Sequence, residues 1–128
     1  MNDQIQTPGA YEEFLQQHPG TGLLRVQVST ARGTFPVPGA QVEVSRLFGG
    51  RRRILYSRMT DNSGVVEGLR LPTQSRGASL EESTAGGSGT EYQVSVYHPG
   101  YLPLRLQSVT LFDGIEPILP VALEPQVR

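Results

Sequence analysis

Residues 22–29 read Gly-Leu-Leu-Arg-Val-Gln-Val-Ser, and this stretch decides the fold class. Apolar residues at 24, 26 and 28 alternate with polar residues at 25, 27 and 29, which is the period of a strand with one buried face. The same alternation recurs outward from it, at residues 40–45 and 92–97. The chain therefore predicts a succession of half-buried strands.

Short strands are expected at roughly ten-residue spacing, and turn sequences separate several of them. These turn sequences are Gly49-Gly50, Asp61-Asn62-Ser63-Gly64, His98-Pro99-Gly100 and Asp113-Gly114. Gly and Pro number 15 and 10 among 128 residues, which excludes a helical bundle. The pattern predicts an all-β fold, a seven- to eight-stranded antiparallel Greek-key sandwich, with the Pro-containing last strand at an edge.

The alternation also predicts which side chains fill the core of this sandwich. The expected inward residues are Leu24, Val26, Val28, Val42, Val44, Leu55, Val94, Val96, Leu104, Leu106, Val121 and Leu123.

Residues 1–20 differ in pattern and are interpreted as a leader with a short helix. Thr7-Pro8 is an N-cap signature, and Tyr11, Phe14 and Leu15 recur at helical spacing, so a helix is predicted over residues 8–17 and packed on the sandwich through these three side chains. Residues 73–90 hold one large apolar residue and are expected to be the most mobile internal segment.

The amino-acid composition excludes several kinds of chemistry. The chain has no Cys, which excludes disulfides, thiolate metal sites and a cysteine nucleophile. Its 11 basic residues are all Arg, so no Lys can form a Schiff base or an isopeptide crosslink. No apolar run is long enough to span a membrane, and the N-terminus lacks the basic and apolar regions of a signal peptide.

Several motifs in order resemble the carboxypeptidase regulatory-like domains, which have a transthyretin-like (prealbumin-like) β-sandwich. The motifs are Pro38-Gly39-Ala40-Gln41-Val42, then Thr60-Asp61-Asn62-Ser63-Gly64, then Pro99-Gly100-Tyr101. The resemblance covers residues 21–125 and leaves residues 126–128 as a C-terminal tail. It implies the fold and no particular activity.

The leader adds a narrower likeness, through Tyr11-Glu12-Glu13-Phe14-Leu15 and Pro19-Gly20. It looks like the N-terminal domain of peptidoglycan-binding proteins of spore-forming bacteria. This resemblance implies a non-catalytic structural or interaction module of a bacterial cell-envelope or spore protein, with a protein or a cell-wall polymer as partner. A peptidoglycan- or carbohydrate-binding module is the first alternative, although the chain has no Trp for a stacking platform.

The second alternative is a small hydrolase using His98, which would need a Ser and an acid beside it. The chain lacks the C-terminal Tyr-Arg-Gly-Ser motif of hydroxyisourate hydrolases. An intradiol dioxygenase needs two His around its iron, whereas one of the two His of this chain, His18, lies in the leader. Residues 61–64 lack the acid spacing of a calcium loop. No catalytic residue, metal or cofactor is therefore expected.

Charge is distributed unevenly along the chain, although the net charge is only −1. Five arginines and no acid lie between residues 44 and 60, whereas the rest of the chain carries six arginines against 12 acids. They form a possible site for an anionic partner, or else a solvated hairpin that deters edge pairing. Nucleic acid is the least expected partner, because the sequence pI is about 6.1. The candidate residues are Arg46, Arg51, Arg52, Arg53 and Arg58.

Overall fold

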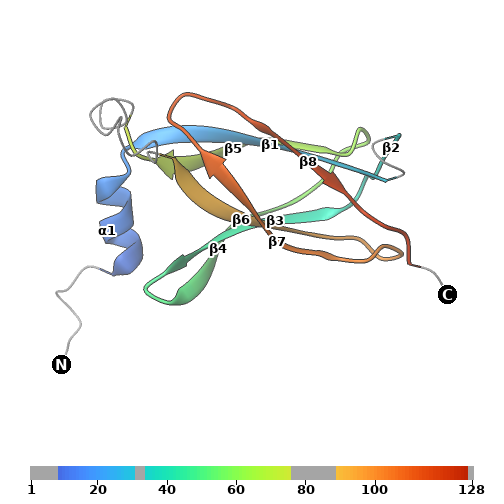
Figure 1. The fold of residues 1–128 in the computed structure, drawn as a ribbon, viewed down its shortest axis with the longest axis horizontal. Helices are drawn as coiled ribbons and strands as arrows, with labels where there is room; N and C mark the ends of the chain where they lie inside the picture. The colour runs from blue at the N-terminus through green and yellow to red at the C-terminus, as the bar shows by residue number, and fades with distance from the viewer. Residues whose placement is uncertain (1–8, 31–33, 76–88, 127–128) are drawn as a thin grey trace.

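The computed structural model describes residues 9–30, 34–75 and 89–126, and the side chain of Arg105 is also outside the description. Residues 76–88 of the predicted mobile segment 73–90 therefore lie outside the described residues, as does the predicted cap at Thr7. The ends of that segment, Thr73 and Thr90, are buried strand residues. Within the described residues eight strands form two sheets, and one helix packs against them (Figure 1). Their bounds are α1 Ala10–Gln17, β1 Gly20–Thr30, β2 Phe35–Pro36, β3 Gln41–Phe48, β4 Arg51–Met59, β5 Val65–Thr73, β6 Thr90–Tyr97, β7 Leu104–Leu111 and β8 Ile118–Ala122.

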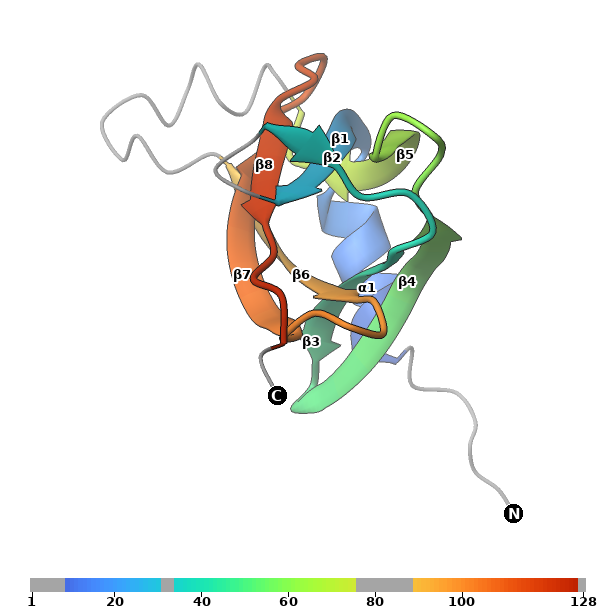
Figure 2. The same ribbon diagram turned by 90° about the vertical axis from the view of Figure 1, so that its right-hand side faces the viewer.

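The two sheets confirm the predicted β-sandwich. One has the order β2-β1-β5 with β8 also paired to β1, and the other has the order β4-β3-β6-β7. Helix α1 lies across one end of the sandwich, at the far end in the view of Figure 2. Strand β8 is an edge strand as predicted, but it runs parallel to β1, whereas the sequence predicted antiparallel pairing throughout.

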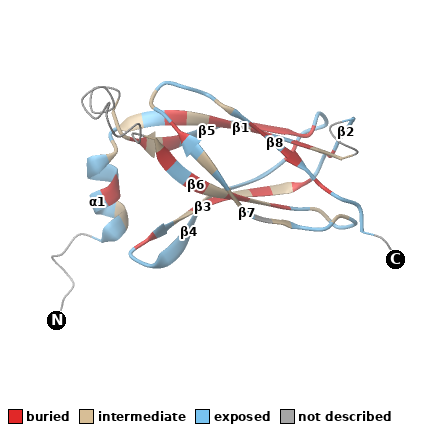
Figure 3. Cartoon of the chain, viewed as in Figure 1, coloured by how far each residue is buried: buried red, intermediate tan, exposed pale blue. Residues whose placement is uncertain are grey.

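The core follows the predicted alternation with few exceptions (Figure 3). Leu55 and Leu104 are only partly buried against it. Leu106 is wrongly predicted, because it is 46% exposed and has a φ of +35° at a register shift between β6 and β7. A bulge of this kind turns one side chain out of the alternation.

The turn motifs that carried the resemblance have structural roles. The buried Thr60 hydroxyl accepts a hydrogen bond from the Ala40 amide at 2.8 Å and donates one to the Val37 carbonyl at 2.7 Å. Asp61 Oδ1 accepts bonds from the amides of Ser63 and Val65, at 2.9 and 3.0 Å. The Thr60 bonds fix the β4–β5 connection to the loop before β3, and the Asp61 bonds close the turn itself.

Helix α1 begins later than predicted, with Gly9 as its N-cap and no side-chain cap. Phe14 is buried and Tyr11 packs against the core, as predicted, but Leu15 is 39% exposed and the prediction for it is wrong. No helix in the described part of the chain is long and apolar enough to cross a membrane.

Candidate functional site

The β3–β4 hairpin places the five candidate arginines. Its two-residue turn, Gly49-Gly50, has φ values of +58° and +82°, which only glycine adopts without strain. The register sets Phe48 opposite Arg51 and Arg46 opposite Arg53. Because side chains alternate along a strand, these four residues share the face that meets α1, whereas Arg52 lies on the opposite face.

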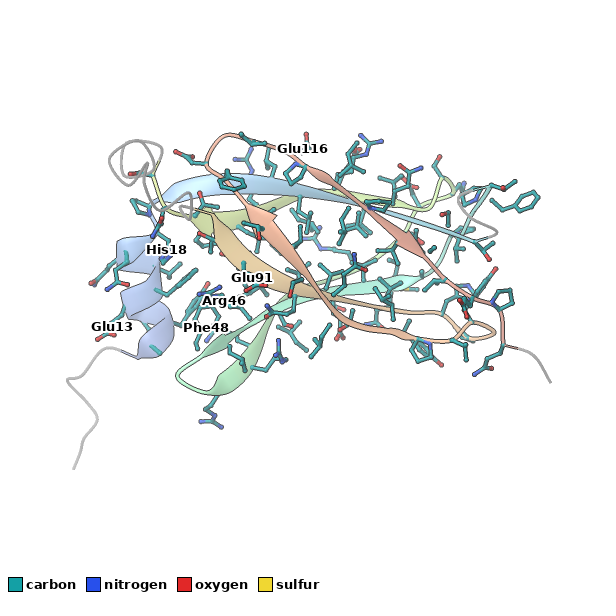
Figure 4. All side chains as sticks on the ribbon, viewed as in Figure 1. Glu13, His18, Arg46, Phe48, Glu91 and Glu116 are labelled. Atoms are coloured by element: carbon teal, nitrogen blue, oxygen red, sulfur yellow. The ribbon has the colours of Figure 1, made fainter. Side chains whose placement is uncertain are left out.

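Arg46 lies beside α1 with Phe48 next to it (Figure 4). Its Cζ is 4.7 Å from the ring centroid of Phe14, 5.8 Å from that of Tyr92 and 5.9 Å from that of Phe48. Its Nη1 donates a hydrogen bond to the Glu91 carbonyl. A guanidinium held over ring faces gains cation–π attraction. Arg46 therefore joins α1 to β3 and β6 and is not a free charge.

The rings around Arg46 also pack on one another. Phe14 and Phe48 meet edge to face at 5.0 Å, and Tyr11 meets Phe48 in the same way at 5.0 Å. His18 stacks on Phe14 at 3.9 Å, with its Nδ1 2.8 Å from the Phe14 carbonyl. This arrangement closes the end of the sandwich with one charge and several aromatic faces.

Tyr92 lies on the inner side of this group of aromatic rings and is fully buried. Its hydroxyl donates a hydrogen bond to the Pro72 carbonyl on β5, so it links the two sheets. Burial raises the pKa of the Tyr92 hydroxyl above its ordinary value, and the nearby positive charge of Arg46 only partly opposes this.

Arg51, Arg52 and Arg53 line a groove of about 450 Å³ between the hairpin and the first turn of α1. The Arg53 guanidinium lies 4.1 Å from the ring centroid of Tyr11. The groove is also lined by Phe48 and by one acid, Glu12. A Cβ at Gly49 would lie 3.2 Å from that of Ala10, so the hairpin tip packs against the helix rather than projecting alone.

Arg52 and Arg58 also make contacts outside this groove. Arg52 Nη1 donates bonds to Ser45 Oγ at 3.0 Å and Gln93 Oε1 at 3.3 Å, on the outer face of the sheet. Arg58 stacks at 5.1 Å on Tyr56, beyond the bulge in β4. The structure therefore divides the predicted cluster into one packed arginine, Arg46, three that line the groove, and Arg58 apart from them.

The sequence prediction missed the aromatic partners of these arginines. Tyr11, Phe14 and Tyr92 are distant from residues 44–60 along the chain, so no local pattern joins them to the hairpin. One signal was available for Arg46 itself. It continues the inward alternation of Val42 and Val44, and that period alone places its side chain on the core face.

His98, the residue of the hydrolase alternative, lies in the turn after β6. Its Nδ1 is 2.6 Å from the Pro99 carbonyl, and its ring meets the edge of the Tyr101 ring at 5.2 Å. Within the described residues it forms no hydrogen bond with a Ser hydroxyl or a carboxylate. The same part of the chain contains no group of three or more acids or histidines that could hold a metal ion.

Three solved structures share the architecture described above. They are the Bacillus anthracis TIE protein (20% identity, TM-score 0.55, 83% of this chain and 17% of that one), GBS52, the minor pilin of Streptococcus agalactiae (16%, 0.53, 85% and 46%), and chlorocatechol 1,2-dioxygenase from Pseudomonas putida (15%, 0.54, 84% and 61%). The chain thus spans less than two thirds of each. No protein-family model and no curated protein matches the sequence.

At these identities the likeness shows a β-rich sandwich fold and nothing finer. Two of the three neighbours are a pilin and a bacterial protein, and the third is an oxidative enzyme, so one fold serves different functions. A carboxypeptidase regulatory-like family is not shown by these neighbours. The fold is compatible with a structural module.

Proposed function

We propose that this chain is a non-catalytic β-sandwich module of the carboxypeptidase regulatory-like type, acting as a structural or interaction domain of a bacterial envelope or spore protein. The observation that carries the proposal is the environment of the Arg46 side chain. The most deeply placed candidate charge is surrounded by the rings of Phe14, Phe48 and Tyr92, where it stabilises packing. The shared fold of a minor pilin supports the same proposal.

The surroundings of His98 also support a non-catalytic role. A histidine general base must be within reach of the proton it takes, and its second nitrogen is ordinarily oriented by another group. Here one ring nitrogen faces the carbonyl of the next residue, Pro99, and the ring rests on Tyr101. These contacts are those of a turn residue.

One observation favours the carbohydrate-binding alternative as a second candidate. A hollow of about 220 Å³ on the outer face of β3 and β6 is lined by Gln41, Glu43, Ser95 and Tyr97. Tyr97 is 54% exposed, and an exposed ring beside amide, hydroxyl and carboxylate groups has the composition of a sugar subsite. A single ring gives little stacking area, which is why this function ranks second.

Co-sedimentation with insoluble peptidoglycan separates the two candidates. A structural module stays in the supernatant, whereas a peptidoglycan-binding module sediments saturably and loses that binding in Tyr97→Ala and Glu43→Gln. An ester-hydrolysis assay with the wild type and His98→Ala tests the enzyme alternative. Turnover that disappears with His98 would overturn the proposed function.

A further inference from the structure

We propose that the exposed edge of β4 binds an extended acidic segment of a partner protein, which adds to the sheet as a further strand beside Arg51, Arg52 and Arg53. This inference rests on the proposed function and gives the interaction module a partner of defined chemistry. It comes from the backbone edge and the charges of the same strand.

Strand β4 offers a backbone edge. It is the last strand of its sheet and pairs with β3 on one side, and the described residues place no strand on the other side. All of its residues are exposed except Leu55 and Tyr56, which are partly buried. The bulge lies at Leu55, so residues 51–54 keep an unbroken register with β3. Unpaired backbone groups in such a segment are a template for a further strand.

The other sheet edges are interrupted. Strand β8 contains Pro120, which donates no ladder bond, and β5 contains Gly68 at a φ of +74° and Pro72. Strand β7 has a register shift at Leu106 and pairs regularly with β6 over residues 107–111, which carry no charge. The arginine segment of β4 contains neither proline nor a residue with positive φ. It is therefore a regular edge segment that also carries a row of like charges, which the regular part of β7 does not.

Charge selects the partner. Among the described residues the one ion pair joins Arg25 and Glu67 at 3.3 Å, so the arginines of β4 have no acid bound to them. A second copy of β4 would set arginines opposite arginines, which is unfavourable. The arginines that repel a second copy of β4 attract an acidic strand, so the same charges favour one partner and exclude the other.

The spacing of the arginines fits an extended peptide. Arg51 and Arg53 are alternate residues of one strand, so they are about 6.6 Å apart on one face. Alternate carboxylates of an extended segment have the same spacing, and a guanidinium can bind a carboxylate through two bonds. Arg52 meets the intervening residue on the opposite face. Wall polymers and lipid headgroups would bind these charges but would not form backbone hydrogen bonds along the edge of β4.

The test uses a fluorescent eight-residue peptide in which Glu and Val alternate. Two further versions carry N-methyl groups, each on one of the two sets of alternate amides, and a third replaces Glu with Lys. Anisotropy titrations at about 50 and 300 mM salt measure binding to the full chain. Amide resonances of ¹⁵N-labelled protein locate the contact, and they also show that each variant is folded.

The protein variants are Arg51→Gln/Arg53→Gln and the control Arg70→Gln, which removes an exposed charge from β5 in the other sheet. We expect the wild type to bind the Glu peptide with amide shifts at residues 51–54, and the double variant to bind about tenfold more weakly. Arg70→Gln should change the affinity by less than about twofold. Methylation of one amide set should abolish binding, whereas methylation of the other should not.

Equal binding of both methylated peptides would overturn strand addition, since charge alone ignores backbone amides. Binding of the Lys peptide, or no binding of the Glu peptide, would overturn it as well. So would binding of anionic vesicles or wall polymer at these arginines in place of the peptide. Of these outcomes only the binding of wall polymer bears on the proposed function, because it favours the peptidoglycan-binding alternative. The proposed function fails separately if ester turnover disappears with His98.

Discussion

The two strands of the β3–β4 hairpin use arginine in opposite ways. On β3, Arg46 is half-buried among three aromatic rings and donates a bond to the Glu91 carbonyl. On β4, Arg51 and Arg52 are exposed, and Arg53 rests one face on Tyr11 while lining an open groove. Strand position explains the difference, because β3 has a neighbour on each side and β4 has one.

This contrast shows that a run of like charges in sequence is not one site in space. An inner strand under a helix brings its charge into the packing, where loss of that residue costs stability. An edge strand leaves its charges in solvent, where they set which partners can approach. Substitutions paired across the two strands test this division.

Phe48→Ala should have the largest effect on the free energy of unfolding. Phe48 is 9% exposed and packs edge to face on both Tyr11 and Phe14, so truncation removes burial and leaves a cavity under the helix. We expect a loss of about 3 kcal/mol, measured by urea denaturation. Leu47→Ala, at a neighbouring residue that is 52% exposed, should change it by less than about 0.5 kcal/mol. Equal losses would contradict the burial assigned to this end.

Arg46→Met should rank next, with a loss of about 2 kcal/mol in the same measurement. Methionine keeps an apolar stem beside Phe14 but removes the charge over the rings and the donor to the Glu91 carbonyl. The matched control, Arg52→Met, removes only side-chain bonds on the outer face and should cost less than about 0.5 kcal/mol. If the two substitutions were equivalent, Arg46 would be a surface charge like the others.

Only part of this contrast between β3 and β4 could be predicted from the sequence. Alternation predicted the strands and most of the core, because a strand with one buried face needs period two. The hairpin followed from Gly49-Gly50 for a local reason, its positive φ values. The parallel pairing of β8 with β1 could not be predicted, because alternation shows which face is buried and not which strand lies beside it.

The candidate site could be predicted less well than the fold. The sequence located the arginines and the edge but treated all five as one surface group. Their separation depends on α1, which brings Tyr11 and Phe14 to the hairpin from outside the segment. The exposure of Leu106 depends on a bulge that no turn residue marks. Contacts between distant segments and irregular register are the parts that local patterns do not contain.

Tyr92→Phe should cost about 1 kcal/mol at neutral pH, because the Pro72 carbonyl loses its donor. The variant should also change the response to alkali. The pKa of Tyr92 is raised in the folded state, so its stabilising effect is complete below the ordinary tyrosine pKa of about 10 and is lost as pH rises above it. Thermal melts between pH 8 and 11 should therefore show a steeper decline for the wild type than for Tyr92→Phe. Parallel declines would mean that the hydroxyl ionises as freely in the folded protein as in the unfolded one.

The triple substitution Arg51→Gln/Arg52→Gln/Arg53→Gln should have the smallest effect on stability, below about 1 kcal/mol. Most of that loss should come from Arg53, whose guanidinium stacks on Tyr11 at 4.1 Å, and the single variant Arg53→Gln should reproduce it. The same triple variant should lose nearly all salt-dependent binding of an anionic partner, because exposed charges act mainly through screened attraction. A protein that kept its stability but bound acidic peptide less well would separate the two strands of the hairpin by function. A loss as large as that of Phe48→Ala would instead place these arginines inside the packing and remove the distinction between β3 and β4.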